Sequence, residues 1–158
     1  MSRPRQITLR FFAQPTEQNA LGKVHGGSVM KWIDEAGAAV AIAWSSTVCV
    51  TVHVGGIRFV KPIAVGSLIE VRARLIHTGR TSMQVAVDVL ASDPRVGTFV
   101  QATHCVLGFV AIDERGKPVE VPSWQPESED DLALQQHALD AMALSKAMEA
   151  EMSRYIVD

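Results

Sequence analysis

The length and composition of the sequence fit one globular domain with a tail. The chain has 158 residues, of which 47% are hydrophobic, so it can bury a core of ordinary size. A net charge of −2 argues against a nucleic-acid-binding protein. No window approaches the roughly 20 apolar residues of a membrane helix, and the N-terminus alternates where a signal peptide would have an apolar block. We therefore expect a cytoplasmic protein without membrane segments.

The distribution of charged residues and the spacing of the cysteines indicate which ligands and sites to expect. Residues 1–112 carry 11 basic and 6 acidic residues (net +5), whereas residues 113–158 carry 4 and 11 (net −7). A mildly basic body suits an anionic small ligand, although a solvated mixed surface explains it equally well. Cys49 and Cys105 lack C-x-x-C spacing. They are expected to be reduced core thiols, not a zinc or redox site.

The first two predicted elements are a strand and a core helix. Residues 5–12, "RQITLRFF", alternate polar and apolar side chains, which is the period of a half-buried strand. A polar, punctuated loop follows. Residues 28–44 contain few polar side chains among Val, Met, Trp, Ile and many Ala, and a helix that is hydrophobic all round is typical of a core.

Four further strands are predicted downstream of this helix. The segments "TVCVTVHV", "SLIEVRARLIHTG", "TSMQVAVDVLAS" and "GTFVQATHCVLGFVAID" are β-branched or alternating runs divided by Gly and Pro punctuation. Their connections are mostly too short for crossover helices, so the strands should pair antiparallel. The sequence predicts an α+β domain whose five-stranded antiparallel sheet curls around its helix.

The last part of the chain is predicted to be a linker and a helical tail. Residues 113–131 are rich in proline and charge, and from Asp130 onward apolar or small residues recur every three or four positions up to Tyr155. We expect a domain over residues 1–122 and a tail over 123–158. The helical stripe could pack on the domain or on a partner subunit, or it could fray.

The stretch "HGGSVMKWIDEAG" contains the main chemical candidate. Two glycines at a helix start permit close approach of a ligand, and the first helical amides lack intrahelical partners. Further along, Asp34 falls by helical spacing on a face with Met30, Gly37 and Ala41. A carboxylate in low dielectric is costly unless it is hydrogen-bonded or engaged in chemistry, and burial raises a carboxyl pKa toward the range of a general base. Glu35 is expected to be solvated or structural.

Asn19 lies in the loop upstream of the glycines. Turn formation is the ordinary reason for an asparagine in a loop. An amide side chain can also hold a water molecule without titrating, which suits a site where a carboxylate acts as a base. By spacing alone, the pairing of Asn19 with Asp34 is a hypothesis.

From Asn19 to Ala36 the pattern N-x-x-G-x-V-H-G-G-x-x-x-x-x-x-D-E-A resembles the signature of hotdog-fold acyl-CoA thioesterases, the cytosolic acyl-CoA hydrolase group. The later motifs F-x-x-P-x-x-x-G and G-R-T-S-M occur in the expected order, and the resemblance covers roughly residues 6 to 122. It implies a hotdog fold and hydrolysis of fatty acyl-CoA to a free fatty acid and CoA. It implies no metal and no other cofactor.

The resemblance also assigns roles to particular residues. Asp34 corresponds to the catalytic aspartate, acting as general base or as nucleophile, and Asn19 to the asparagine that orients water. Gly27 would present its backbone amide to the thioester oxygen. The two side chains act across a dimer interface in this family, so the resemblance implies a homodimer, or a trimer of dimers. The implied CoA contacts are Val52, His53, Val54, Thr81, Ser82 and Met83.

Several other residues remain candidates with ordinary alternatives. His25 could touch substrate, whereas His53 and His104 lie on predicted strands, where histidines are more often satisfied core or interface residues. Cationic side chains bind CoA phosphates well, and the candidates are Arg58, Lys61 and above all Arg80, which adjoins the G-R-T-S-M turn.

Two alternative functions are compatible with the same fold. A hotdog hydratase or dehydratase would need a histidine beside the carboxylate, and no His follows Asp34 within its helix. A non-catalytic module that senses or carries acyl-CoA is the other alternative, in which the acidic C-terminal helix could recruit a protein partner.

Overall fold

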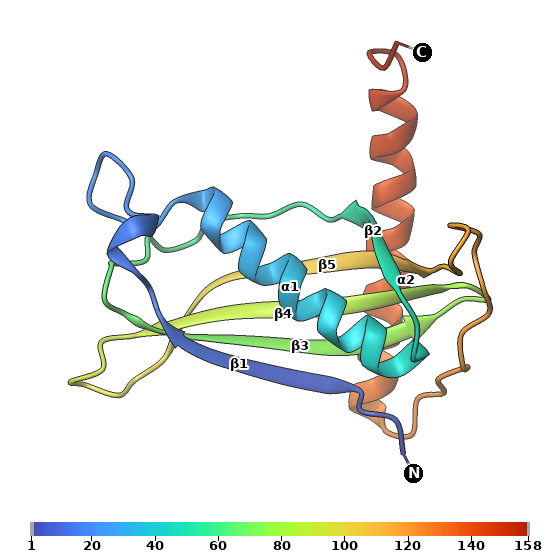
Figure 1. Cartoon of the computed structure of the whole chain (residues 1–158), viewed down its shortest axis with the longest axis horizontal. Coiled ribbons are helices and arrows are strands. Elements are labelled where there is room, and N and C mark those ends of the chain that lie inside the picture. The colour runs from blue at the N-terminus through green and yellow to red at the C-terminus, as the bar shows by residue number, and fades with distance from the viewer. Residues whose placement is uncertain (1, 158) are drawn as a thin grey trace.

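Five antiparallel strands form one sheet that curls around a long helix (Figure 1). The computed structural model describes residues 2–157. Its elements are β1 (Gln6–Phe12), the 3-10 turn η1 (Pro15–Glu17), α1 (Gly26–Ser45), β2 (Cys49–Val54), β3 (Leu68–Thr78), β4 (Ser82–Ser92), β5 (Val100–Ala111) and α2 (Glu129–Met152). The α+β prediction and the order of its elements are confirmed.

The strands lie in the order β1-β3-β4-β5-β2, and every pairing is antiparallel. Long hairpin registers, such as Val71 opposite Val89, keep the β-branched side chains of neighbouring strands on the same face. Strand β2 is the last strand of the sheet and pairs only with β5. One long edge of the sheet, formed by β2, therefore has no second strand beside it.

Helix α1 packs on the inner face of the sheet and closes the core. Its side chains Ile33 and Val40 are fully buried together with Leu107 and Phe109 of β5. Gly37 is required at this contact, because a Cβ there would lie 2.9 Å from the Phe109 ring. The small residues of α1 thus let the helix lie close against the sheet.

The prediction that α1 is buried all round was wrong. Met30 is 47% exposed and Ile42 45%, and Asp34 is also exposed. The reason is geometric: the curled sheet reaches only part of the way around the helix and leaves open the side that adjoins the β2 edge. The low-dielectric surroundings expected for Asp34 are absent in a single chain.

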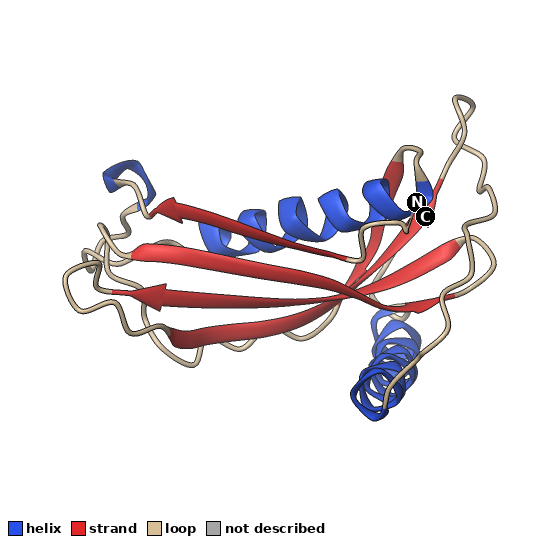
Figure 2. Cartoon of the chain, turned by 90° about the horizontal axis from the view of Figure 1, so that it is seen from below, coloured by secondary structure: helices blue, strands red, loops and turns tan. Residues whose placement is uncertain are grey.

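Helix α2 packs on the opposite, outer face of the sheet (Figure 2). Ser128 caps its first turn, and Asp131 forms an ion pair with Arg5 at 2.6 Å. Ala138 is completely buried against Ala86 and Val106. The predicted tail helix is confirmed, and its first half is docked on the domain. No helix within residues 2–157 is long and apolar enough to cross a bilayer.

Candidate active site

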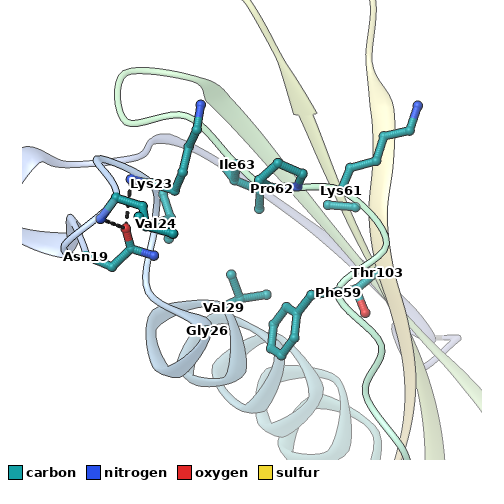
Figure 3. Close-up of a pocket in the computed structure, with 12 residues that line it drawn as sticks. Asn19, Lys23, Val24, Gly26, Val29, Phe59, Lys61, Pro62, Ile63 and Thr103 are labelled. Carbon is teal, nitrogen blue, oxygen red and sulfur yellow. Dashed lines mark hydrogen bonds between the residues drawn. The ribbon is translucent and has the colours of Figure 1, made fainter.

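A pocket of about 250 Å³ lies at the end of the sheet where α1 begins (Figure 3). It lies between the loop that carries Asn19 and the segment that follows β2. Its lining residues are Asn19, Leu21, Lys23, Val24, Gly26, Val29, Phe59, Lys61, Pro62, Ile63, Ala102 and Thr103. Both charged residues of this lining are lysines, so a mostly apolar pocket has a cationic rim.

The side chain of Asn19 both shapes its loop and faces the pocket. Its Oδ1 accepts hydrogen bonds from the backbone N–H groups of Leu21 at 2.9 Å and Lys23 at 3.0 Å. This is the ordinary turn role of a loop asparagine. The side-chain nitrogen points away from the turn, toward the pocket (Figure 3). Asn19 can therefore offer the pocket a hydrogen-bond donor but no free acceptor.

The start of α1 provides backbone donors beside Asn19. Gly26 lines the pocket, and a Cβ at this position would lie 3.1 Å from the Phe59 ring. Gly27 is exposed and has open space around its Cα, as the predicted amide donor requires. The first N–H groups of a helix have no intrahelical partners and favour negative charge. Together these groups can stabilise a developing oxyanion.

Asp34 is held by a residue that the sequence did not single out. Thr51 of β2 donates a hydrogen bond from Oγ1 to Asp34 Oδ1 at 2.6 Å. The bond joins the exposed side of α1 to the edge strand and fixes the direction of the carboxylate. Sequence reasoning considered only the next three positions of β2, and no short-range spacing connects residues 34 and 51.

A single chain does not bring Asp34 and Asn19 together. Asp34 is absent from the pocket lining and lies eight residues along α1 from Gly26, or about 12 Å at the rise of an α-helix. The two predicted catalytic side chains therefore occupy separate positions on one open side of the molecule.

The surface around Asp34 is unusually apolar for a sheet edge. Val50, Val52 and Val54 of β2 are 38%, 57% and 49% exposed, and Met30 lies on the neighbouring helix. Edge strands are normally protected by charged residues, bulges or a covering element. Apart from a bulge between Thr51 and His53 in its pairing with β5, β2 lacks these protections. An uncovered apolar edge of this kind is typical of a subunit interface.

The predicted CoA contacts fall into two groups on one chain. Val52 and Val54 are exposed on the β2 edge, while burial lowers the pKa of the His53 imidazole. The Arg80 turn joins β3 to β4 at the end of the sheet opposite the Asn19 loop (Figure 1).

Within the Arg80 turn, Thr81 and Ser82 are half-buried, whereas Met83 is completely buried in the core. Only the backbone of Met83 could meet a ligand. Arg80 itself is exposed and lies 3.9 Å from the Glu120 carboxylate. Among the other cation candidates, Lys61 lines the pocket and Arg58 is exposed on the segment after β2.

The remaining histidines and cysteines have structural surroundings. His104 Nδ1 lies 2.7 Å from Asp88 Oδ1, and its Nε2 lies 2.9 Å from Nε2 of His137 on α2. His25 is exposed at the N-cap of α1. Burial raises the pKa of the Cys105 thiol to about 11. Residues 2–157 contain no group of three or more His, Cys, Asp and Glu side chains that could hold a metal ion.

Comparisons with known proteins agree with this geometry. The family model of the thioesterase superfamily matches residues 21–98, which include the glycine-rich start of α1 and the β2 edge. The acyl-CoA thioester hydrolase YciA of Escherichia coli K12 is 36% identical over 120 residues, covering 73% of this chain and 90% of YciA. The chain belongs to the acyl-CoA thioester hydrolases.

Solved structures extend the similarity beyond the sheet. An acyl-CoA thioesterase solved as an apo hexamer has a TM-score of 0.86 at 32% identity, covering 92% of this chain and 93% of its own. An acyl-CoA hydrolase of Staphylococcus aureus, solved with butyryl-CoA, CoA and CoA disulfide, has a TM-score of 0.86 at 27% identity and covers 95% and 92%. The hotdog fold of this thioester hydrolase is thereby confirmed.

The S. aureus hydrolase has also been solved as three single alanine variants, of an asparagine, an aspartate and a threonine. In that chain the aspartate follows the asparagine by 15 residues, and the threonine follows the aspartate by 17. Asn19, Asp34 and Thr51 have the same two spacings here.

Proposed function

We propose that this protein hydrolyses acyl-CoA thioesters at sites shared between two copies of the chain. Asp34 from one copy supplies the catalytic carboxylate, and Asn19 with the start of α1 from the other supplies hydrogen-bond donors. The observation that carries the proposal is the Asp34–Thr51 hydrogen bond on an open apolar edge, some distance from the Asn19 pocket. The matched spacings in the S. aureus hydrolase support the choice of these residues.

The β2 edge is the natural place for the second copy. Antiparallel pairing of this edge, which β2 and residues 55–60 form, with the same edge of a second copy would satisfy free backbone groups and bury Val50, Val52 and Val54. The same pairing would cover Asp34 and remove it from water. Because a two-fold axis reverses the direction of α1, the partner's pocket end would approach Asp34. Relatives of this family are hexameric, which fits three such dimers.

The reaction follows from the groups that this arrangement brings together. Thr51 engages Oδ1 of Asp34, so Oδ2 is the oxygen left to remove a proton from water as the water attacks the thioester carbonyl. The amide nitrogen of Asn19 and the N–H of Gly27 donate to the carbonyl oxygen as it becomes negative. Each well-placed donor of this type contributes about 3–4 kcal/mol to transition-state stabilisation. The C–S bond then breaks, and the proton that Asp34 removed from water passes to the leaving sulfur, so that CoA departs as the free thiol.

The surroundings of Asp34 favour hydrolysis over hydration of a double bond. A hydratase would need a histidine beside the carboxylate to move protons at two carbons. The side-chain partner of Asp34 is a threonine, and His53 and His104 are committed to the strands. The lysines of the pocket rim, Lys23 and Lys61, suit the phosphates of CoA.

The experiment is a panel of acyl-CoA substrates from two to eighteen carbons, read by release of free thiol. We expect turnover by the native protein and a loss of about 10²- to 10⁴-fold in Asp34→Asn, the range contributed by a general base. Glu35→Gln is the matched control, since Glu35 is the adjacent exposed carboxylate and pairs only with Lys31, at 3.9 Å. Full turnover by Asp34→Asn would refute the assignment.

A single-turnover reaction in H₂¹⁸O separates the two roles open to Asp34. A general base leaves the label in the fatty acid alone, as proposed. Attack by the carboxylate would form a mixed anhydride, and water that opens it at the aspartyl carbonyl would place the label in Asp34, so label in Asp34 refutes the general-base role.

A further inference from the structure

The C-terminal half of α2 extends past the sheet on which its first half is docked (Figure 1). This overhanging half carries an apolar stripe of Leu144, Met148, Met152 and the following Tyr155, whose exposures are 73%, 63%, 52% and 76%. Leu144, Met148 and Met152 step by four, so they lie on one side of the helix, and Tyr155 follows in the turn after it. Within residues 2–157 of a single chain, no segment covers this stripe.

The stripe begins where α2 leaves its own sheet. Ala138 packs between Ala86 of β4 and Val106 of β5. The edge of the sheet beside β5 is formed by β2 and the residues that follow it. Neighbouring strands are about 4.8 Å apart, so the outer limit of this edge lies about 10 Å from Ala138, measured across the strands. At about 1.5 Å per residue, α2 covers that distance in six or seven residues and arrives near Leu144. The exposed stripe therefore lies where a second sheet would begin.

The two-fold axis of the proposed dimer lies close to this part of the edge. This inference rests on the proposed function, in which two copies share each site. Thr51 lies beside Asp34, and Phe59 lies against Gly26 at the pocket end of α1. For the pocket end of the partner to reach Asp34, the axis must cross the edge midway between Thr51 and Phe59, near Gly55. Gly55 donates its N–H to the carbonyl of Val106 at 2.9 Å, directly in the path of α2.

The stripe faces sideways along the sheet. Met148 follows Ala138 by ten residues, which at 3.6 residues per turn rotates it by about 80° from the docked face. His137 lies on the same side as Met148 and reaches His104. The stripe is thus turned toward the flank of α2 instead of toward its own sheet or directly away from it.

We infer that the overhanging halves of two α2 helices pack antiparallel, side by side, across the axis of the dimer. A pair centred between Leu144 and Met148, just past the edge, would place Leu144 beside the partner's Met148. The second copy is thereby held twice, at the β2 edges and by its α2 helix.

Cysteine cross-linking tests the helix pair in the full-length protein. Met148→Cys places two thiols within reach of each other close to the centre of the pair, whereas Ala150→Cys lies about 200° around the helix and points away. The native thiols are a weak background, since burial raises the pKa of both Cys49 and Cys105. We expect a short bis-maleimide to link Met148→Cys at least about tenfold faster than Ala150→Cys, because packed helices lie about 8–10 Å apart.

Equal rates for the two variants, or no linked dimer of Met148→Cys, would overturn the helix pair. Light scattering and thiol release on the same samples separate this outcome from failure of the proposed function. An active dimer without cross-linking refutes the helix pair alone. Efficient cross-linking of a protein that releases no thiol from any acyl-CoA refutes the proposed function and leaves the helix pair standing.

Discussion

The two edge strands of the sheet, β1 and β2, differ in the polarity of the side chains that they expose. On β1, the outward-facing Gln6, Thr8 and Arg10 are polar, and Arg10 forms an ion pair with Glu70 at 2.7 Å. On β2, three of the four exposed side chains are valines, and the fourth is Thr51. A polar edge resists association with another sheet, whereas an apolar edge favours it. The catalytic candidate lies at the apolar edge, so we connect the chemistry to the part of the fold that a single chain leaves open.

Introducing a charge at the apolar edge should have the largest effect. Val54→Asp, one residue from Gly55, would bring two carboxylates close together across the proposed interface, and opposed like charges cost several kcal/mol. We expect a monomer by light scattering and a loss of at least about tenfold in turnover. Thr8→Asp makes the same change at the β1 edge and should leave both properties unchanged. An active oligomer of Val54→Asp would contradict the difference between the edges.

A smaller effect is expected from the hydrogen bond that directs Asp34. Thr51→Val keeps the shape of the side chain but removes the donor to Oδ1. We expect kcat to fall by about tenfold, or about 1.4 kcal/mol, with KM nearly unchanged. Thr8→Val on the other edge is the matched control. A rise in KM without a fall in kcat would show that Thr51 acts in binding.

The smallest effect concerns the docked half of α2. The hydrogen bond from Arg5 lowers the pKa of Asp131 below its ordinary value, and Arg74 adds to this effect. A carboxyl whose pKa is lower in the folded state stabilises the fold above its unfolded pKa and loses that contribution as the pH falls. The melting temperature of the native protein should therefore exceed that of Asp131→Asn by a constant amount above about pH 5.

As the pH falls from about 4 through the lowered pKa of folded Asp131, the two melting temperatures should converge, because Asp131 is then protonated in both states. A gap that persists at acid pH would show that Asp131 acts through packing or its backbone contacts and not through its charge. The activity of both proteins should be the same at neutral pH, since Asp131 lies on the outer face, away from the pocket.

The parts of the fold that could be predicted from the sequence have local causes. The alternation of polar and apolar residues predicted β1, and the Gly-Gly pair predicted the start of α1. Apolar or small residues recurring every three or four positions predicted α2. Asp34 was singled out by helical spacing and Asn19 as a loop amide, and the family resemblance assigned their roles; Asn19 indeed faces the pocket.

What the sequence did not reveal depends on long-range geometry. Thr51 meets Asp34 only because the edge strand passes beside the helix, 17 residues later. The burial expected around Asp34 was wrong for one chain, since helical periodicity cannot tell whether a face is covered by its own sheet or by another copy.

Mixing two inactive variants measures the shared site most directly. Asn19→Ala and Asp34→Ala proteins, refolded together in equal amounts, form mixed dimers with one intact site if the two side chains come from different copies. Random pairing should then restore about a quarter of native turnover. Each variant refolded alone should remain inactive. If the mixture is no more active than its components, each site is built within one chain, and the account of the β2 edge as the place of catalysis is wrong.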